Sequence, residues 1–330
     1  MKKLFVMLMT AVLVAGFAAC GAKGDENGKE ENKKFELAYP AGMTEQGYET
    51  LVLDEVPTRI VCASSSQVLT LYEMGASIIA MPSASATKHI LEKNSNITKL
   101  ASLMSDDFNI ENVVALNPDL VILSTSYKDS HGATLESLGI NVYYQAAGHG
   151  VAYETVKEES MCLIDAFAVD EESKAKAEEL KKSFEDIEDT CEKLSKTYEG
   201  KKIMVLQIGG VNMVYGQTSA GTLGSMMDML GFDNVSDSTA AASMFAIDYE
   251  TALVEQPEVL VVVGSGDAAA TRTLMDEIIA ANPEYWNAMT AVAENRILSL
   301  GIEYISVYGI GYVETLGNLA DDVAAFYAGE

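Results

Sequence analysis

Two glutamates stand in the same local pattern at two distant places in the chain. Residues 109–123 read NIENVVALNPDLVIL and residues 248–262 read DYETALVEQPEVLVV. In each stretch the glutamate, Glu111 or Glu250, is followed seven positions later by a proline, then by an acid and an apolar run. A carboxylate at this place favours the positive N-terminus of a short helix, and the proline ends that helix. We therefore expect an acid at the start of a helix twice.

The elements that must hold these acids alternate between strand and helix. The apolar run after each proline suits a strand buried on both faces of a parallel sheet. The matching spacing at two places predicts two similar lobes. The expected ribbon, strands and helices cover residues 36–53, 58–64, 66–75, 78–82, 110–116, 119–124, 131–138, 141–146, 201–210, 222–232, 259–263, 273–281, 296–301 and 311–327. Such alternation predicts an α/β fold with doubly wound parallel sheets.

Residues 169–199 interrupt this alternation with a highly charged segment that lacks Gly and Pro. Apolar residues recur there at alternating steps of four and three, at Leu180, Phe184, Ile187, Cys191, Leu194 and Tyr198. That spacing places one apolar stripe on a helix, which would reach roughly 45 Å over its length. We expect a single rigid helix between two lobes, 36–168 and 200–330. A coiled coil is the competing interpretation, which the short stripe disfavours.

The start of the chain has the features of an export signal. Two lysines precede an apolar run that ends at Val14, and small residues follow before Cys20. This pattern predicts a signal peptide over residues 1–19, because the run is too short to span a membrane. Residues 17–20 read FAAC and resemble a lipobox, which predicts a lipidated Cys20 and a flexible tether over 20–35. An ordinary secretory signal with a chance cysteine is the alternative.

Charge and cysteine content narrow the function classes. The formal net charge of −27 argues against nucleic-acid binding and against direct adhesion to anionic lipid. Three cysteines follow the signal, at positions 62, 162 and 191, and no pair has the spacing of metal ligands. We expect all three to be buried as small hydrophobic residues.

Several short motifs, in this order, make the chain resemble a known family. They are Pro57-Thr58-Arg59-Ile60-Val61, Asn109-Ile110-Glu111, Asn117-Pro118-Asp119, Asp248-Tyr249-Glu250, Pro257, Trp286, Ala291-Val292 and Asn295-Arg296-Ile297. Over residues 50–330 the chain resembles class III periplasmic binding proteins, the lipoproteins that deliver iron–siderophore complexes, haem or cobalamin to ABC importers. The resemblance implies two Rossmann-like lobes joined by one long rigid helix, with the ligand between them.

The resemblance also implies a role for the repeated acids. In the family such glutamates dock each lobe onto arginines of the permease dimer, and the matching positions here are Glu111 and Glu250. A helix that precedes a parallel strand begins at the edge where strands end, which is where ligands of open α/β sheets bind. The two acids should therefore flank the mouth of the cleft. Alternatively, each acid only complements its helix dipole, worth about 0.3–1 kcal/mol.

The cleft itself should be built from loops that follow the carboxyl ends of strands. The candidate ligand-binding residues on these loops are Ser64, Ser65, Ser66, Gln67, Ser126, Tyr127, Lys128 and His149 in the first lobe, and Gly209, Asn212, Met244, Phe245, Tyr304 and Tyr308 in the second. The serine run is equally suited to capping the helix that follows it. The two loop tyrosines offer amphipathic contact surface.

The charge of these loops restricts the ligand. Arginine occurs only at Arg59, Arg272 and Arg296, and the first and last precede strands, at the edge opposite the cleft. A triply anionic ferric catecholate calls for several guanidinium groups. A neutral or cationic chelate, such as a ferric hydroxamate or a corrinoid, fits the sequence better, with Lys128 as one available charge.

Three other interpretations stay open. Haem could be held through His149, although a lone histidine is weak evidence. Direct Zn²⁺ or Mn²⁺ binding would need clustered histidines and carboxylates, and the chain has only three histidines. A chelatase-like enzyme would need a catalytic centre, and we find no nucleophile elbow, phosphate loop or metal triad. We therefore expect a monomeric, lipid-anchored, extracytoplasmic carrier that has no catalytic role and needs no cofactor.

Overall fold

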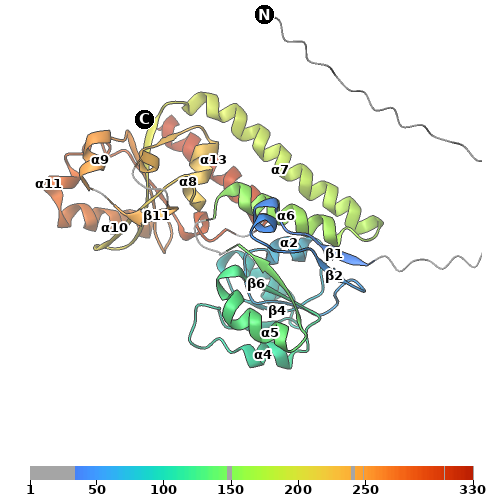
Figure 1. Cartoon of the computed structure of the whole chain (residues 1–330). Coiled ribbons are helices and arrows are strands. Elements are labelled where there is room, and N and C mark those ends of the chain that lie inside the picture. Colours follow the sequence, from blue (N-terminus) through green and yellow to red (C-terminus); the bar gives the residue numbers. More distant parts are fainter. Residues whose placement is uncertain (1–33, 147–150, 239–241, 248, 308, 330) are drawn as a thin grey trace, which may run out of the picture. The chain divides into compact units, whose positions relative to one another are not determined.

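The computed structural model describes residues 34–146, 151–238, 242–247, 249–307 and 309–329. The expected signal peptide and Cys20 lie outside these residues, as do His149 and Tyr308. Figure 1 shows two α/β lobes, with α4, α5, β4 and β6 in one and α9, α10, α11 and β11 in the other. Within the described residues, no helix is both long enough and apolar enough to span a bilayer.

The first lobe is built on a five-stranded sheet in the order β5-β4-β3-β6-β7, parallel throughout. Its strands are β3 (Ile60–Cys62), β4 (Ile78–Pro82), β5 (Thr98–Leu100), β6 (Leu120–Ser124) and β7 (Asn141–Gln145). Its short helices are α2 (Val68–Glu73), α3 (Lys88–Lys93), α4 (Ile110–Ala115) and α5 (Ala133–Ser137). Every residue of β6 is buried, as the apolar run predicts for a strand covered on both faces.

A small ribbon precedes this sheet, as the sequence predicts. Strand β1 (Phe35–Leu37) pairs antiparallel with β2 (Leu51–Leu53), and α1 (Ala41–Glu45) lies between them in the chain. The ribbon packs against the first lobe through Tyr39, whose ring stacks on that of Tyr143 at 4.4 Å between centroids. The ribbon is therefore part of the lobe's core.

The second lobe is built on a mixed sheet in the order β11-β9-β8-β12-β13, with β10 also paired to β8. Its strands are β8 (Lys202–Gly210), β9 (Met213–Gln217), β10 (Asp233–Asn234), β11 (Met244–Ala246), β12 (Val259–Val263) and β13 (Ile297–Leu300). Its helices are α8 (Thr222–Met229), α9 (Tyr249–Glu255), α10 (Ala268–Ala281), α11 (Pro283–Trp286), α12 (Thr290–Ala293) and α13 (Gly311–Ala328).

The expectation of a purely parallel sheet is wrong for this second lobe. Strand β9 runs antiparallel to both β8 and β11. The cause is a tight return after Gly210, which pairs with Met213 across the turn with a shift in register. Two-strand hairpins are antiparallel by construction, whereas parallel neighbours need a long crossover. Met244 and Phe245, expected in a loop, lie in the edge strand β11.

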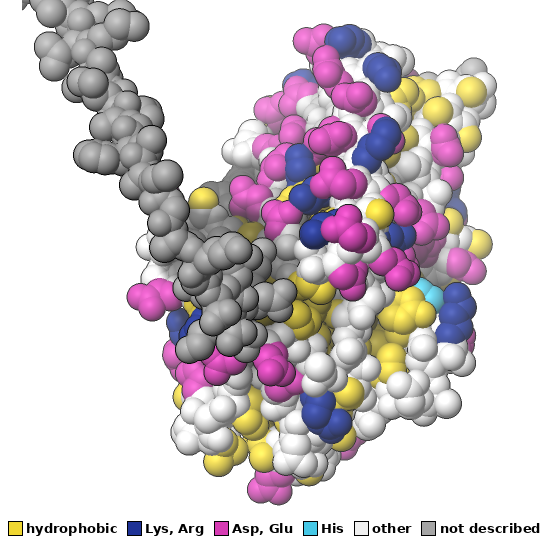
Figure 2. Space-filling view, turned by 90° about the vertical axis from the view of Figure 1, so that its right-hand side faces the viewer, with side chains coloured by type: hydrophobic (Ala, Val, Ile, Leu, Met, Phe, Trp, Pro, Cys, Tyr) yellow, Lys and Arg dark blue, Asp and Glu magenta, His cyan; other side chains and the backbone are white. Residues whose placement is uncertain are grey.

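Two helices lie between the two lobes in the chain. The long helix α7 (Glu171–Tyr198) begins at a capping box formed by Asp170 and Ser173. Its predicted stripe is buried except for Leu194, which is half-buried, so that prediction is confirmed. The opposite face carries many exposed acids and lysines, which crowd the upper part of Figure 2. Before it lies α6 (Tyr153–Phe167), a helix that the alternation of strands and helices did not reveal.

The apolar interior divides into two clusters. The larger one joins the first lobe, α6, α7, α8 and α13 to one face of the second sheet. The smaller one lies on the other face of that sheet, around the fully buried Trp286. Cys62 and Cys191 are buried as predicted, and Cys162 is half-buried; all three are free thiols.

Candidate functional site

The lobes meet at a seam of buried hydrogen bonds. The backbone N–H of Ile310 donates to Thr70 Oγ1 over 3.0 Å, and that hydroxyl donates to Gln67 Oε1 over 2.7 Å. Ser160 Oγ donates to the same amide oxygen over 2.9 Å, and Gln67 Nε2 donates to the carbonyl of Val156. Gln67, only 1% exposed, thus links the second lobe, α2 and α6. Its amide is used in holding the lobes together.

Close approach at this seam depends on a glycine. Gly309 has a backbone φ of 55°, a left-handed conformation that glycine adopts at little cost. A Cβ there would lie 2.3 Å from Thr70 Oγ1 and 2.8 Å from Gln67 Oε1. Any larger residue would push the segment before α13 away from α2.

The second lobe contributes its own half of the seam. The hydroxyl of Tyr312 lies 3.1 Å from the carbonyl of Val151 and 3.0 Å from that of Thr222, and it contacts Ser225 Oγ. The N–H of Tyr153 donates to the same serine over 3.1 Å. Burial raises the pKa of Tyr312, so this hydroxyl stays neutral and serves as a hydrogen-bonding group. The starts of α6, α8 and α13 are joined in this way.

A small cavity of about 20 Å³ lies within the seam. Both lobes and α6 line it, through Ser66, Gln67, Ala146, Val151, Val156, Glu159, Thr222, Val307 and Tyr312. Of the candidates chosen from the sequence, Ser66 and Gln67 are the two found in this cavity.

Glu159 is the acidic side chain in that cavity, and it is 2% exposed. Its carboxylate accepts the backbone N–H of Ala146. Burial raises the pKa of Glu159 to about 7, while hydrogen bonds from Ala146 and Gln67 act in the opposite direction. Sequence reasoning missed this residue. The available signal was an acid within the apolar stripe of a helix, since Val156 and Leu163 are buried three and four positions away.

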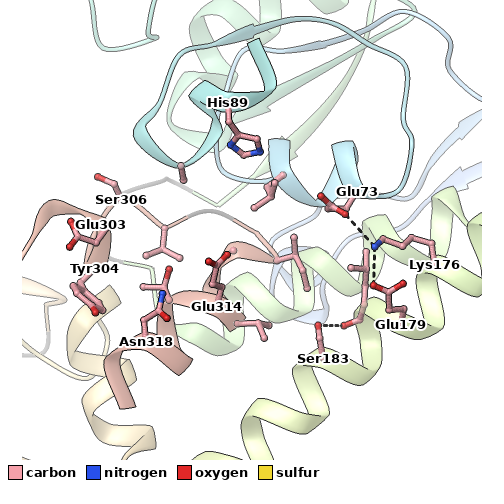
Figure 3. Close-up of a pocket in the computed structure, with 18 residues that line it drawn as sticks. Glu73, His89, Lys176, Glu179, Ser183, Glu303, Tyr304, Ser306, Glu314 and Asn318 are labelled. Atoms are coloured by element: carbon pink, nitrogen blue, oxygen red, sulfur yellow. Dashed lines mark hydrogen bonds and ion pairs between the residues drawn. The ribbon is translucent and has the colours of Figure 1, made fainter. Parts of the chain in front are cut away.

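A larger groove of about 660 Å³ lies between α2 and α3 of the first lobe and α13 of the second, with α7 along one side (Figure 3). Four acids line it, at Glu73, Glu179, Glu303 and Glu314. Lys176 reaches two of them, with its ammonium 3.3 Å from Glu73 and 3.0 Å from Glu179. Leu69, Ala86, Leu180, Val307, Ile310 and Val313 supply its apolar lining. The groove therefore suits a partly apolar molecule that is not anionic.

Tyr304 is the candidate residue that lines this groove. The side chain is buried, and its hydroxyl donates to Asp322 on α13. Burial and the nearby carboxylate raise the pKa of Tyr304. Its ring edge can meet a ligand, but its hydroxyl is already bonded within the protein.

The serines after β3 do not cap the following helix through their side chains. Gln67 stands at the N-cap of α2, and no side-chain cap bond is present there. Instead, the N–H of Ser66 donates to Ser64 Oγ, and the two hydroxyls lie 3.0 Å apart. Ser65 and Ser66 are half-buried at the carboxyl end of the strand.

The candidates after β6 are held away from both cavities. The hydroxyl of Tyr127 donates to the carbonyl of Leu103 over 3.1 Å. The Lys128 ammonium lies 3.9 Å from the centre of the Tyr48 ring, a cation–π contact. Ser126 lies within the turn that follows β6, and its N–H donates to the side chain of Ser124, the last residue of that strand. In this geometry the positive charge of Lys128 is directed to the ribbon side of the lobe.

The second-lobe candidates gather on the β8–β9–β11 edge. Gly209 and Asn212 lie at or beside the hairpin turn, and the ring of Phe245 packs over Gly216. Met244 is 43% exposed and, at the turn, Met213 is 50% exposed. None of the four predicted residues lines either cavity described above. The exposed Met213 was missed because the hairpin itself was not foreseen.

The two repeated glutamates occupy equivalent places in the fold. Glu111 is exposed in the first turn of α4, where its N–H is held by Asn109 Oδ1 at 2.7 Å. Glu250 is the second residue of α9. Each helix leads into a central strand, β6 or β12, and so begins near that sheet's carboxyl edge. Among the described residues, no group of three or more His, Cys, Asp or Glu side chains is arranged to hold a metal ion.

The chain is similar in sequence to a known protein family and to a curated protein. Residues 60–304 match the model of a family described as periplasmic binding proteins. The ABC transporter substrate-binding lipoprotein YvrC of Bacillus subtilis strain 168 is 19% identical over 320 residues, which cover 96% of this chain and 95% of that protein.

Two solved structures illustrate the likeness in fold. A periplasmic binding protein from Veillonella parvula superposes with a TM-score of 0.66 at 17% identity, over 83% of this chain and 93% of that one. A protein of the ABC-type Fe³⁺-hydroxamate transport system from Saccharomonospora viridis gives a TM-score of 0.59 at 22% identity, over 83% and 96% of the two chains. At such identities these matches establish the fold alone.

Proposed function

Because the chain belongs to the periplasmic binding protein family, as its motifs predicted, we propose that it captures a metal chelate between its lobes and delivers it to an ABC importer. The observation that carries this proposal is the convergence of both lobes on one seam with a small cavity and a groove beside it. Ligand sites in proteins of this architecture lie between domains and at the carboxyl edges of parallel strands. The function is stoichiometric binding and release, without turnover of the chelate.

The ligand class follows from charge. The groove carries four acids against one lysine, and that lysine is engaged by two of the acids. Lys128, the other base considered for the ligand, lies against Tyr48. A polyanionic catecholate would meet repulsion, whereas a neutral or cationic ferric hydroxamate or a corrinoid would not. The hydroxamate class is also named for the Saccharomonospora viridis relative.

The remaining loop candidates belong to this proposal. Ser64, Ser65 and Ser66 and the edge with Met244 and Phe245 would meet the chelate from opposite lobes, with Tyr304 and Tyr308 contributing aromatic surface. Gln67 would act as a positioning residue, because its amide already bridges α2 and α6. His149 stays a candidate for a contact from the first lobe.

Delivery and location complete the proposal. Glu111 and Glu250 would meet two equivalent patches of a permease dimer. Cys20 would carry the lipid that holds the monomeric protein at the extracytoplasmic face of the cell membrane, and the Bacillus subtilis relative is likewise a lipoprotein. A two-chain anchor is stable, and a solvated tether leaves the lobes free to reach the permease.

A thermal-denaturation panel with matched chelates tests the proposal. Ferric hydroxamates, a ferric catecholate, haem and a corrinoid are compared at the same free concentrations. A ligand present at about a hundred times its dissociation constant stabilises the fold by roughly 2.7 kcal/mol. We expect stabilisation by a hydroxamate or a corrinoid and none by the catecholate, with one chelate bound per protein in calorimetry. No shift with any chelate, or chemical conversion of the chelate, would reject the carrier assignment.

A further inference from the structure

Glu159 lies at the floor of the seam without a cationic partner. In the described part of the chain no lysine, arginine or histidine forms an ion pair with its carboxylate. The titratable groups that act on it are the hydroxyls of Tyr39 and Tyr143 and, on its own helix, the thiol of Cys162. All of these are neutral near pH 7. The carboxylate therefore relies on the N–H of Ala146 and the amide of Gln67.

A buried carboxylate without a cationic partner lowers the free energy of unfolding. Removing a charge from water costs several kcal/mol unless it is paired, so core positions are normally apolar or fully hydrogen-bonded. Glutamine would accept the same N–H without the charge. A buried acid that lines a cleft and has a perturbed pKa is therefore a candidate functional residue.

The strand that leads to the cavity ends in another unpartnered polar side chain. Gln145, the last residue of β7, is fully buried, and neither its amide oxygen nor its amide nitrogen has a hydrogen-bond partner in the described structure. Alternation along the strand puts it on the same face as Tyr143, two residues earlier, whose hydroxyl interacts with Glu159. The next residue, Ala146, lines the cavity. Gln145 itself is not among the residues that line the cavity, so its amide lies beside the subsite and is not one of its ligands.

The size and polarity of the cavity select the group that fits. A volume of about 20 Å³ admits a single group of the size of a water molecule or an ammonium. Acceptors on its lining include the carboxylate of Glu159 and the hydroxyl of Ser66. A primary ammonium offers N–H donors to these acceptors and a positive charge to the carboxylate. A water molecule would satisfy the acceptors but would not balance the charge.

We propose that Glu159, together with Ser66, forms a subsite at the cleft floor that receives the protonated primary amine of the transported chelate. This inference rests on the function proposed above and narrows its ligand to an amine-bearing metal chelate. Glu303 and Glu314 give the neighbouring groove a negative lining that attracts such a cation, and Val307 lines both the groove and the cavity.

A matched pair of ligands tests the subsite with the full-length protein. The probes are a linear ferric trihydroxamate that ends in a primary amine and the same chelate with that amine acetylated. Calorimetry at pH 8 should give at least about tenfold tighter binding of the amine form, as a charge-assisted hydrogen bond predicts. Between pH 8 and pH 6 the preference should shrink as Glu159 takes up a proton, while affinity for the acetylated chelate stays flat. This profile needs no variant, so it does not depend on a mutant folding.

The variants Glu159→Gln and Glu158→Gln sharpen the test. Both remove one carboxylate from α6, but Glu158 is exposed. Glu159→Gln should bind both chelates with the affinity that the wild type shows for the acetylated one, without pH dependence, and Glu158→Gln should behave as wild type.

Equal binding of both chelates by the wild type, which would fit a water molecule alone in the cavity, overturns the subsite and leaves the carrier function standing. A preference retained by Glu159→Gln places the amine elsewhere and also overturns it. Failure of the wild type to bind either chelate rejects the hydroxamate function, and the subsite with it.

Discussion

The two lobes hold the same central pair of strands but differ beside it. In the first lobe β3 lies between β6 and β4, both parallel to it along its length. In the second lobe β8 pairs with β12 along one edge, whereas two strands, β10 and β9, share its other edge. The first two residues of β8 pair with β10, and four of its last five pair with the antiparallel β9. The β8–β9 hairpin thus takes the place beside β8 that the parallel strand β4 has beside β3.

The apolar cores of the two lobes also differ. The first lobe lies wholly within the cluster that includes α6, α7 and α13. The second lobe divides its apolar residues between that cluster and a separate one around Trp286. We therefore expect the lobes to unfold together as far as the shared cluster joins them, and α7 contacts α6, α8 and α13 within that cluster. The two lobes therefore share a repeated sequence pattern, but their cores are packed differently.

Truncation of Phe184 should have the largest effect. Its ring is fully buried in α7 and belongs to the shared cluster. Phe184→Ala should cost about 3–5 kcal/mol of unfolding free energy, the range for large-to-small core changes. Leu194→Ala, on the same stripe but half-buried, is the matched control and should cost clearly less. Denaturant titrations followed by circular dichroism and by Trp286 fluorescence should give one coincident, shifted transition. Separate transitions for the two probes would mean that the lobes are independent domains.

The second prediction concerns Glu159 and the pH dependence of the free energy of unfolding. The first-lobe side contains Glu159, with its pKa raised from 4.5 to about 7, whereas the second-lobe side contains neutral hydroxyls such as that of Tyr312. The folded state binds the proton more tightly than the unfolded state does, so wild-type stability falls as pH rises from 4.5 to 7 and then levels off. Glu159→Gln lacks this penalty and should be more stable at pH 8 by up to about 3 kcal/mol.

The measurement is urea denaturation of ligand-free protein between pH 4.5 and pH 8. Wild type and the exposed control Glu158→Gln should lose stability in parallel across that interval, and Glu159→Gln should not. Parallel curves for all three proteins would show that Glu159 ionises normally and that the seam does not respond to pH in this range.

The sequence predicted the elements whose pattern comes from burial. β6 and β12 are fully buried runs, and the α7 stripe repeats over many turns, so their periodicity is unambiguous. It missed β9 and β11 because a Gly-Gly return and a three-residue edge strand carry little periodic signal. It missed α6 because Glu159 and Ser160 interrupt the buried face that would have revealed the helix.

The site was less predictable for a physical reason. Strand ends fix which loops reach the sheet edge, but not where their side chains turn. Lys128 lies on an aromatic ring, Tyr304 donates to a helix carboxylate, and Gln67 is used within the seam. Each of these contacts joins residues far apart in the chain, where local spacing carries no information. The repeat of Glu111 and Glu250 was visible because it depends only on local helix and strand order.

The smallest expected effect concerns that repeat and asks whether the lobes are equivalent toward the permease. Glu111 is exposed, with its N–H held by the Asn109 cap, and Glu250 stands at the matching place in α9. Exposed charges at the rim of an interface mainly affect encounter, so Glu111→Gln or Glu250→Gln should weaken permease binding by about three- to fivefold, more at low salt. Neither change should alter chelate affinity, and the helix-dipole loss in stability stays within about 1 kcal/mol. Surface plasmon resonance against the permease in lipid nanodiscs, paired with chelate titration of each variant, measures both quantities.

Equal losses of permease affinity would show that the two lobes dock equivalently despite the hairpin. A loss confined to one variant would show that the asymmetry of the sheets extends to docking. Unchanged binding in the double variant would leave the acids as helix-end charges, and lost chelate affinity would place them in the ligand site.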